Sequence, residues 1–297
     1  MLKKRLSYEK QKSWIGFAFI SPWVIGFIYL FARPLIKSLV YTFNKLQIQP
    51  NGLIMEFAGF ENYRYAFTED PVFIRLLVES IGNILYQVPL ILIFSLFVAV
   101  ILNQKFRGRF LARGVFFLPV IIASGVIINI LRGDTLSAEI LSGERVSFLF
   151  EVTAFEQMLI QAGLREDLVL FFTNLTNQIF ELSWKSGIQI LVFLAGLQTI
   201  PGSLYEASAM EGATPWETFW KVTFPMISPM IILNLVYSII DNFSDYTNQV
   251  LRLINQHSQN LNMAYSATLA WIYFIVVFVI VGIVYAIVNR HVFYNVE

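Results

Sequence analysis

Six long stretches without a charged residue constrain the fold of this chain more than any other feature of its sequence. Each reaches the roughly 18 to 20 residues that a helix needs to cross the hydrocarbon of a bilayer. They lie at residues 13–32, 80–104, 114–131, 186–205, 222–240 and 253–289. Of the 297 residues, 57% are hydrophobic and 14% are charged, a composition too apolar for an ordinary soluble protein. We therefore expect an all-α polytopic membrane protein with six transmembrane helices.

The positions of lysine and arginine predict which loops face the cytoplasm, because short cytoplasmic loops carry an excess of basic residues. Basic residues cluster before the first apolar run and between the second and third, at Lys3, Lys4, Arg5, Lys10, Lys12, Lys105, Arg107, Arg109 and Arg113. The segment 133–181 is rich in acidic residues and suits the outer side. Six spans then place both the N-terminus and the C-terminus in the cytoplasm, together with the loop around Glu206.

The apolar runs predict one membrane domain with short tails. The expected parts are a basic cytoplasmic tail at 1–12, a transmembrane domain at 13–290, an extended external connector at 133–181 within it, and a cytoplasmic tail at 291–297. A seventh apolar run, 168–180, is too short to cross alone and is predicted to be an interfacial or re-entrant helix before the fourth span. The first run is expected to be retained rather than cleaved as a signal, since no small-x-small site precedes Arg33.

A polar loop at 202–226, between the fourth and fifth runs, carries a high density of helix-capping signals. Ser203 and Glu206 have capping-box spacing, so a short helix is expected to start at Leu204. Gly212 can adopt the left-handed conformation that ends this helix. The first half of the loop is therefore predicted to be a short helix that stops at a glycine corner.

A second helix start follows at once. Thr214 can cap it, Pro215 has its missing N–H where a helix needs none, and Glu217 completes another capping box. Pro225 is expected to restrict its continuation. The loop as a whole is thus predicted to be two short helices joined at Gly212.

This loop resembles the one found in permease subunits of ATP-binding-cassette importers, which carries Glu-Ala-Ala, a glycine further on and a closing Leu-Pro. The residues that match are Glu206, Ala207, Gly212 and Pro225. The residues that depart from the pattern are Ser208 for the second alanine, Glu211 for a common aspartate and Phe224 for the leucine. None of these departures removes a cap or the corner.

Four further segments are similar to the carbohydrate-type permeases of that family. They are FISPWVIGFIYLFARP at 19–34, FAGFENYRYAF at 57–67, KFRGRFLARGVFFLP at 105–119 and FLAGLQTIPGSLYEA at 193–207. The resemblance covers nearly the whole chain and is weakest from Leu131 to Leu182. It implies the fold of a type I importer permease in a bacterial or archaeal cytoplasmic membrane. It also implies that the chain forms half of a translocation path for a sugar or oligosaccharide that works by alternating access.

The same resemblance implies a set of partners. They are a second homologous permease subunit, two ATPase subunits that bind ATP and Mg, an extracytoplasmic substrate-binding protein, membrane lipid and the carbohydrate. In that family the polar loop is the coupling helix, which seats in a cleft of the ATPase. The coupling residues of this chain would be Glu206, Ala207, Ser208, Gly212 and Pro225.

The sequence offers little equipment for catalysis. It has no G-x-x-x-x-G-K-[ST] loop to hold phosphates, so ATP hydrolysis and its cofactors are expected on a partner chain rather than on this one. With no cysteine, no H-E-x-x-H motif and only His257 and His291, no metal site is expected, and His257 is interpreted as a solvated loop residue. A net charge of +1 gives no reason to expect nucleic acid as a partner.

A polar stripe runs along the fifth apolar run. Its members, separated by four, three and four residues and therefore on one helix face, are Asn234, Ser238, Asp241 and Asp245, with Tyr237 and Asn242 beside them. Carboxylates and amides suit the hydroxyls of a sugar and aromatic rings suit its C–H faces. Ionisable groups at this depth are costly unless they line a cavity or find partners. The stripe either lines the substrate path or packs helix against helix, and the sequence leaves both readings open.

A shorter polar stripe precedes the fourth run. Glu181, Lys185 and Gln189 are four residues apart, and glutamate before lysine is the favourable order for a helical ion pair, so a structural role is predicted. Further candidates near the translocation path are Trp184, Asn83, Gln87 and Asn129.

Two other functions are alternatives to an ATP-driven importer. A secondary carrier driven by an ion gradient would use Asp241 and Asp245 as coupling groups, but it leaves the doubly capped loop unexplained. A membrane-embedded enzyme would need convergent carboxylate, histidine or metal ligands, and the sequence shows no such set. The sequence does not identify the saccharide.

Overall fold

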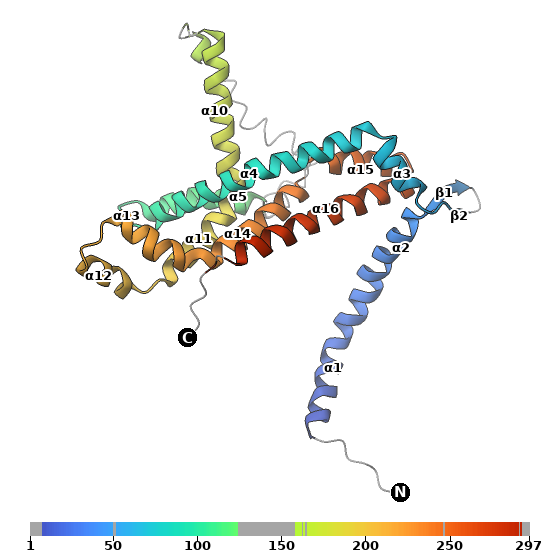
Figure 1. Cartoon of the computed structure of the whole chain (residues 1–297), viewed down its shortest axis with the longest axis horizontal. Coiled ribbons are helices and arrows are strands. Elements are labelled where there is room, and N and C mark those ends of the chain that lie inside the picture. The colour runs from blue at the N-terminus through green and yellow to red at the C-terminus, as the bar shows by residue number, and fades with distance from the viewer. Residues whose placement is uncertain are drawn as a thin grey trace, which may run out of the picture. The chain divides into compact units, whose positions relative to one another are not determined.

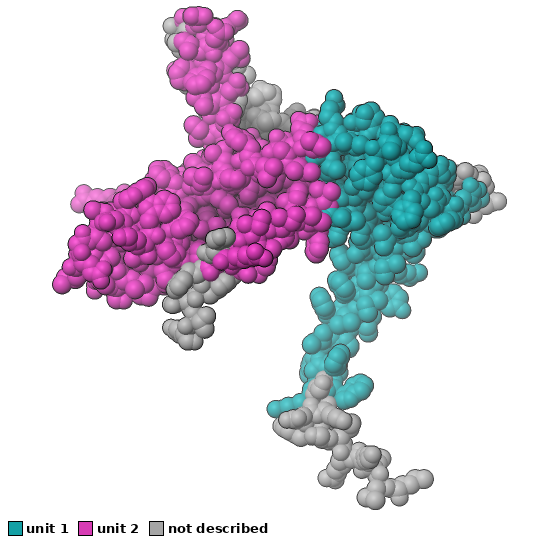
Figure 2. Space-filling model, in the orientation of Figure 1, with its two compact units in different colours: residues 1–77, 250–275 teal, residues 78–249, 276–297 magenta. Residues whose placement is uncertain are grey.

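A computed structural model describes residues 8–49, 52–123, 158–290 and 292, apart from residues 162, 164 and 246. The described chain is mainly helical (Figure 1). It divides into two compact units (Figure 2), unit 1 with Met1–Leu77 and Val250–Ile275, and unit 2 with Val78–Gln249 and Val276–Glu297.

Unit 1 begins with a long helix that is interrupted by one widened turn. α1 (Tyr8–Phe27) continues through the π-helical turn η1 (Ile28–Ala32) into α2 (Arg33–Thr42). Pro34 near the start of α2 accounts for this turn, because proline lacks an N–H and its ring would clash with a carbonyl of the preceding α-helical turn. Trp14, Phe17 and Phe19 are 70%, 72% and 83% exposed, which suits contact with lipid rather than water.

A two-stranded hairpin follows and corrects the all-helical expectation. β1 (Asn44–Gln49) pairs antiparallel with β2 (Gly52–Phe57), with Asn44 opposite Phe57. The sequence contains a signal for this hairpin, because Asn51-Gly52 is typical of a tight hairpin turn. α3 (Glu61–Thr68) then leads to the next long helix.

The last apolar run is two helices rather than one, so the expected single span 253–289 is wrong in its first part. α15 (Gln249–Gln259) ends at a turn in which Leu261 has a φ of 61°, and α16 (Met263–Asn289) starts after it. The amide of Asn262 donates to the carbonyl of His257 at 3.0 Å and closes this turn. His257 therefore lies on α15, with its ring edge-on to that of Tyr265 at 4.9 Å, and not in a solvated loop.

Unit 2 contains the remaining described helices. They are the greater part of α4 (Pro71–Asn103), α5 (Arg109–Ala123), α10 (Glu166–Lys185), α11 (Gly187–Thr199), α12 (Gly202–Met210), α13 (Pro215–Thr218), the π-helical turn η2 (Phe219–Thr223), α14 (Phe224–Ser244) and the end of α16. A core cluster joins α4, α11 and α14 through Leu102, Phe193 and Ile227. Gly196 of α11 packs closely on α14, because a Cβ there would lie 2.6 Å from Cγ of Met230.

The described helices confirm a multi-pass membrane protein, while the count of six spans stays a prediction. Four helical segments are long and apolar enough to cross a bilayer, namely Trp14–Thr42, Pro71–Asn103, Pro215–Ser244 and Met263–Asn289. α10 and α11 make a fifth if the 57° bend between them is a break within one span. The expected fourth span, 186–205, is wrong as a unit, because α11 ends at Thr199.

The expected helix at 168–180 is present, and the expected third span is described only in part. α10 covers the run 168–180 and leads into α11 as expected, but it is longer, at 20 residues. The expected third span, 114–131, coincides with α5 only as far as Ala123, and its remainder lies outside the described residues, as do 133–157 of the external connector. The orientation of the termini stays a prediction.

Candidate functional site

The polar loop forms two short helices around a glycine corner, but its first helix is capped differently from the expectation. α12 begins at Gly202 with Pro201 as its N-cap, and no side chain caps it. The predicted Ser203–Glu206 capping box and the start at Leu204 are therefore wrong. The reason is that extended backbone at Pro201 starts the helix earlier, which places Ser203 inside the first turn, where it cannot act as a cap.

Glu206 does not cap α12, so its carboxylate is not used to stabilise the helix end. Its side chain is exposed on α12, and no hydrogen bond or ion pair engages it within the described part of the chain. An exposed, unengaged carboxylate on a short helix is available to a partner protein.

The corner at the end of α12 is confirmed. Gly212 has a φ of +74°. The amide of Gly212 donates to the carbonyl of Ala209 and that of Ala213 to the carbonyl of Ser208, both at 3.0 Å, which is the hydrogen-bond pattern of a Schellman motif. A Cβ at Gly212 would meet nothing within 4 Å, so backbone conformation rather than space requires glycine here.

The second capping box is also confirmed. The amide of Glu217 donates to Oγ1 of Thr214 at 3.3 Å, and the amide of Thr214 donates to Oε2 of Glu217 at 2.9 Å. Pro215 occupies the first helical turn, where its missing N–H costs nothing.

Pro225 does not stop the second helix, which corrects that part of the expectation. α13 passes through η2 into α14, so one helical segment extends from Pro215 to Ser244. The π-helical turn η2 widens the helix just before Pro225 and so removes the steric conflict of a proline ring with the preceding turn. The same arrangement, a π-helical turn followed by proline, occurs before Pro34. The loop is therefore joined to α14 by an unbroken helix.

The loop also exposes a large apolar surface beside its carboxylates. Met210 is 89% exposed at the end of α12, and Trp216 is 70% exposed on α13. The ring of Trp216 lies edge-on to that of Trp220 at 5.5 Å. Apolar side chains bordered by Glu206 and Glu211 make a surface of the kind that binds another protein.

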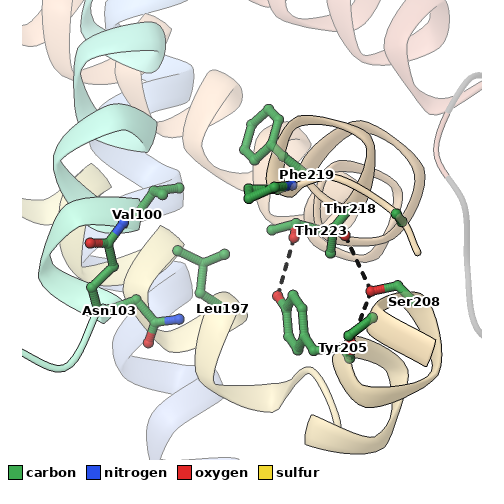
Figure 3. Close-up of a pocket in the computed structure, with 12 residues that line it drawn as sticks. Val100, Asn103, Leu197, Tyr205, Ser208, Thr218, Phe219 and Thr223 are labelled. Atoms are coloured by element: carbon green, nitrogen blue, oxygen red, sulfur yellow. Dashed lines mark hydrogen bonds between the residues drawn. The ribbon is translucent and has the colours of Figure 1, made fainter. Parts of the chain in front are cut away.

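A cavity of about 410 Å³ lies between the loop and the ends of α4 and α11 (Figure 3). Val100, Asn103 and Leu197 line one side of it, and α12 and the start of the second helix line the other. Its lining mixes hydroxyl, amide and apolar side chains and contains no charged one.

The polar stripe of α14 divides into a buried half and a charged half. Asn234 and Ser238 are buried against α11: Nε2 of Gln189 donates to Oγ of Ser238 at 3.0 Å, and Nδ2 of Asn234 donates to the carbonyl of Gln189 at 3.2 Å. Oε1 of Gln189 and Oδ1 of Asn234 are buried without a hydrogen-bond partner in the described chain. Gln189 is a contributor to this site that sequence reasoning had assigned to a separate stripe.

The charged half of the stripe connects α14 to α10. Nζ of Lys185 lies 3.0 Å from Glu181 and 3.1 Å from Asp245, so the predicted Glu181–Lys185 pair is confirmed and extended to a third residue. Burial by itself would raise the pKa of Asp245, but hydrogen bonds from Thr247 and the ion pair with Lys185 outweigh it and hold that pKa below its ordinary value. Asp245 is therefore charged at neutral pH.

The remaining path candidates within the described residues are more accessible than the buried pair of Asn234 and Ser238. Asp241 is exposed and Tyr237 half-buried, while Nδ2 of Asn242 donates to Oε1 of Gln87 on α4 at 2.6 Å. Asn83 is exposed and Trp184 half-buried. Asn129 and His291 lie outside the described residues. Within the described part, no three histidine, aspartate or glutamate side chains gather in a way that could hold a metal ion.

Comparison with known proteins shows which families and relatives this chain is similar to. Residues 168–294 match the family described as "Binding-protein-dependent transport system inner membrane component". The chain is 29% identical to the probable ABC transporter permease protein YesP of Bacillus subtilis (strain 168), over 93% of this chain and 90% of the relative. It is 25% identical to the arabinooligosaccharides transport system permease protein AraP of the same strain, over 87% and 77%. The resemblance found in the sequence is thus confirmed.

A third relative and a solved structure extend the comparison. The sn-glycerol-3-phosphate transport system permease protein UgpA of Pectobacterium atrosepticum is 28% identical over 78% of this chain and 76% of the relative. A chain of the bacterial alginate ABC transporter, solved with an alginate pentasaccharide-bound periplasmic protein, superposes with a TM-score of 0.67 at 19% identity, over 99% of this chain and 100% of that one. This likeness shows that the chain shares the fold of that transporter chain.

Proposed function

We propose that this protein imports a saccharide by alternating access as one half of a translocation path. The proposal is supported by the match of residues 168–294 to the family of binding-protein-dependent inner-membrane components and by the similarity of most of the chain to ABC permeases. Permease subunits of such importers are transport components without a catalytic site. ATP and Mg would bind to two partner ATPase subunits, a second permease would complete the path, and an extracytoplasmic protein would deliver the solute. We place the complex in the cytoplasmic membrane of a bacterium.

The loop between α11 and α14 is the observation that carries this proposal. It presents the exposed Glu206 on a short helix, closes at the Schellman corner of Gly212 and continues without a break into α14. A partner that moves α12 would therefore also displace α14, which is long and apolar enough to span the membrane. The residues proposed to couple the path to the ATPase are Glu206, Ala207, Ser208, Gly212 and Pro225. Pro225 lies inside the continuous helix Pro215–Ser244 and not at its end.

The substrate path is proposed to use the polar face of α14. Asn234 and Ser238 contact α11 in this structure, which supports a packing role for the inner part of the stripe. Tyr237, Asp241 and Asn242 are at least partly accessible, and a carboxylate, an amide and an aromatic ring are the groups that a saccharide needs. Asp245, held by Lys185, is proposed to orient the outer end of the path.

The saccharide class rests on the relatives and is open to direct test. The purified complex, expressed with its neighbouring genes, is reconstituted into proteoliposomes with ATP inside and no ion gradient, and in a parallel set with an ion gradient and no ATP. Labelled arabinotriose, lactose and sn-glycerol 3-phosphate serve as the solutes. ATP-dependent accumulation of one of the two saccharides supports the proposal. Accumulation that needs an ion gradient and proceeds without ATP contradicts it and favours a secondary carrier.

A further inference from the structure

Two pairs of hydroxyl groups tie the helix α12 to the start of the helix that follows it (Figure 3). Oη of Tyr205 lies 3.2 Å from Oγ1 of Thr223, and Oγ of Ser208 lies 3.2 Å from Oγ1 of Thr218. Because Ser208 already donates its only hydroxyl hydrogen to the carbonyl of Tyr205 at 2.9 Å, Thr218 is the donor in the second pair. Each pair joins α12 to the segment Pro215–Thr223.

The same four side chains also line the cavity that separates α12 from α4 and α11. No hydrogen bond in the described chain joins α12 to α4 or α11, and the 410 Å³ cavity lies between them. None of the residues of α12 is fully buried. The ring of Tyr205 does pack on the core cluster of α4, α11 and α14, so α12 also has an apolar contact with the body of the unit.

These two kinds of contact respond differently to a displacement of α12. Apolar contact is non-directional, so a ring can slide over an apolar surface and keep most of its buried area. A hydrogen bond weakens steeply with distance and angle, so the hydroxyl pairs resist any movement of α12 relative to Pro215–Thr223. Movement of α12 toward or away from α4 is opposed only by the apolar contact of Tyr205 and by no hydrogen bond in the described chain.

We propose that Tyr205 and Ser208 are positioning residues that make α12 and Pro215–Thr223 move as one body. A force on α12 then passes into α14 instead of being absorbed by the cavity. This inference rests on the proposed function, in which a partner moves α12. Ser208 stands where the importer motif has its second alanine, so the pair with Thr218 is a feature of this chain's own sequence.

Removing the hydroxyls tests the inference without changing the shape of the loop. Tyr205→Phe and Ser208→Ala each delete one pair. Thr199→Val is the matched control, because in the described part of the chain the hydroxyl of Thr199 bonds within α11, to the carbonyl of Gly196. The readout is solute accumulated per ATP hydrolysed in proteoliposomes, with the three labelled solutes named above. The double variant is expected to lose about fivefold in this ratio, and each single variant less, as fits the net strength of one or two hydrogen bonds.

The amount of ATPase that co-purifies separates positioning from docking. For Tyr205→Phe, which changes none of the proposed coupling residues, it is expected to match the unmodified complex, since Glu206 and Trp216 remain on the surface. A double variant with an unchanged ratio, or a Tyr205→Phe variant that loses its ATPase, overturns the inference. Accumulation that needs no ATP in the unmodified complex would instead contradict the proposed function, so the two failures are distinguishable.

A rescue experiment uses the absence of native cysteine. Ser208→Cys with Thr218→Cys replaces the hydroxyl pair by two thiols in a chain that has no other. When reduced, this variant should transport less solute per ATP than the unmodified complex; when oxidised to a disulfide, it should recover, because the two positions never need to separate. A disulfide that blocks turnover until it is reduced, or a pair that does not oxidise, contradicts the proposal. The cysteine-free chain treated with the same oxidant is the control.

Discussion

Lys185 and Asp245 form an ion pair of 3.1 Å that joins the end of α10 to the end of α14. Their side chains are only 22% and 17% exposed, so water screens the pair weakly. Glu181 reaches the same ammonium group from one turn earlier on α10. Lys185 therefore holds two carboxylates, and it is the member of the group whose loss leaves most charge unmatched.

We expect Lys185→Met to destabilise the protein more than Asp245→Asn. The first change leaves the poorly hydrated Asp245 without its cation, at a cost of about 3 kcal/mol, while Glu181, which is 56% exposed, adds little to that cost. After the second change Lys185 keeps Glu181 as its partner. The double variant should recover part of the loss. Thermal unfolding of the detergent-solubilised protein measures this order, and equal stability of the two single variants would show that the pair contributes little.

Asp241 is expected to behave differently from Asp245, because it is exposed and has no ion-pair partner within 4 Å in the described chain. Asp241→Asn keeps the shape of the side chain and removes its charge. If Asp241 binds sugar hydroxyls, uptake should fall while assembly and basal ATP hydrolysis stay unchanged. Loss of partner subunits in this variant would instead indicate that Asp241 packs against another chain.

Alanine variants of Thr214 and Ser203 test which of the two residues caps a helix. Thr214→Ala removes a capping box and should weaken the first turn of α13 by about 1 kcal/mol, visible as faster amide hydrogen exchange around Glu217. Ser203→Ala should leave exchange in α12 unchanged, because Pro201 is the N-cap there. A larger effect from Ser203→Ala than from Thr214→Ala would reverse the assignment.

The outcome of these two capping boxes shows what the sequence could and could not predict. Both have the same spacing, and only Thr214 caps, because capping requires the residue to stand at the helix boundary and Pro201 sets that boundary earlier. The corner at Gly212 was predictable, since the left-handed conformation has few alternatives to glycine. Local signals succeeded where one residue determines the backbone.

Long-range and helix-geometry features were harder to predict. Gln189 bonds Ser238 from a helix 49 residues away, and no periodicity within either helix indicates which partner a buried amide finds. The continuation of α14 past Pro225 depends on a π-helical turn, which has no sequence pattern of its own. The spans follow from apolar length, but the turn at Leu261 lies inside an uninterrupted apolar run, so hydropathy does not indicate it.

Gly212→Val should uncouple ATP hydrolysis from transport while the protein still inserts. A β-branched residue is strongly disfavoured at a φ of +74°, so the corner must distort. Gly212→Asn should retain most coupling, because asparagine tolerates the left-handed conformation. Gly282→Val is the matched control, at a helical glycine with open space around it. Wild-type uptake with Gly212→Val would show that the corner is not needed.

The central claim, that the loop between α11 and α14 docks on an ATPase, is tested most directly by the ATPase that co-purifies with Glu206→Ala. Because Glu206 caps nothing in this structure, its removal should leave α12 folded, and any loss of partner reports on contact. Glu56→Ala, at an exposed glutamate on β2, is the matched control. We predict that Glu206→Ala releases most of the ATPase during purification while Glu56→Ala retains it. Full retention by Glu206→Ala, with unchanged ATP-driven uptake, would contradict the account.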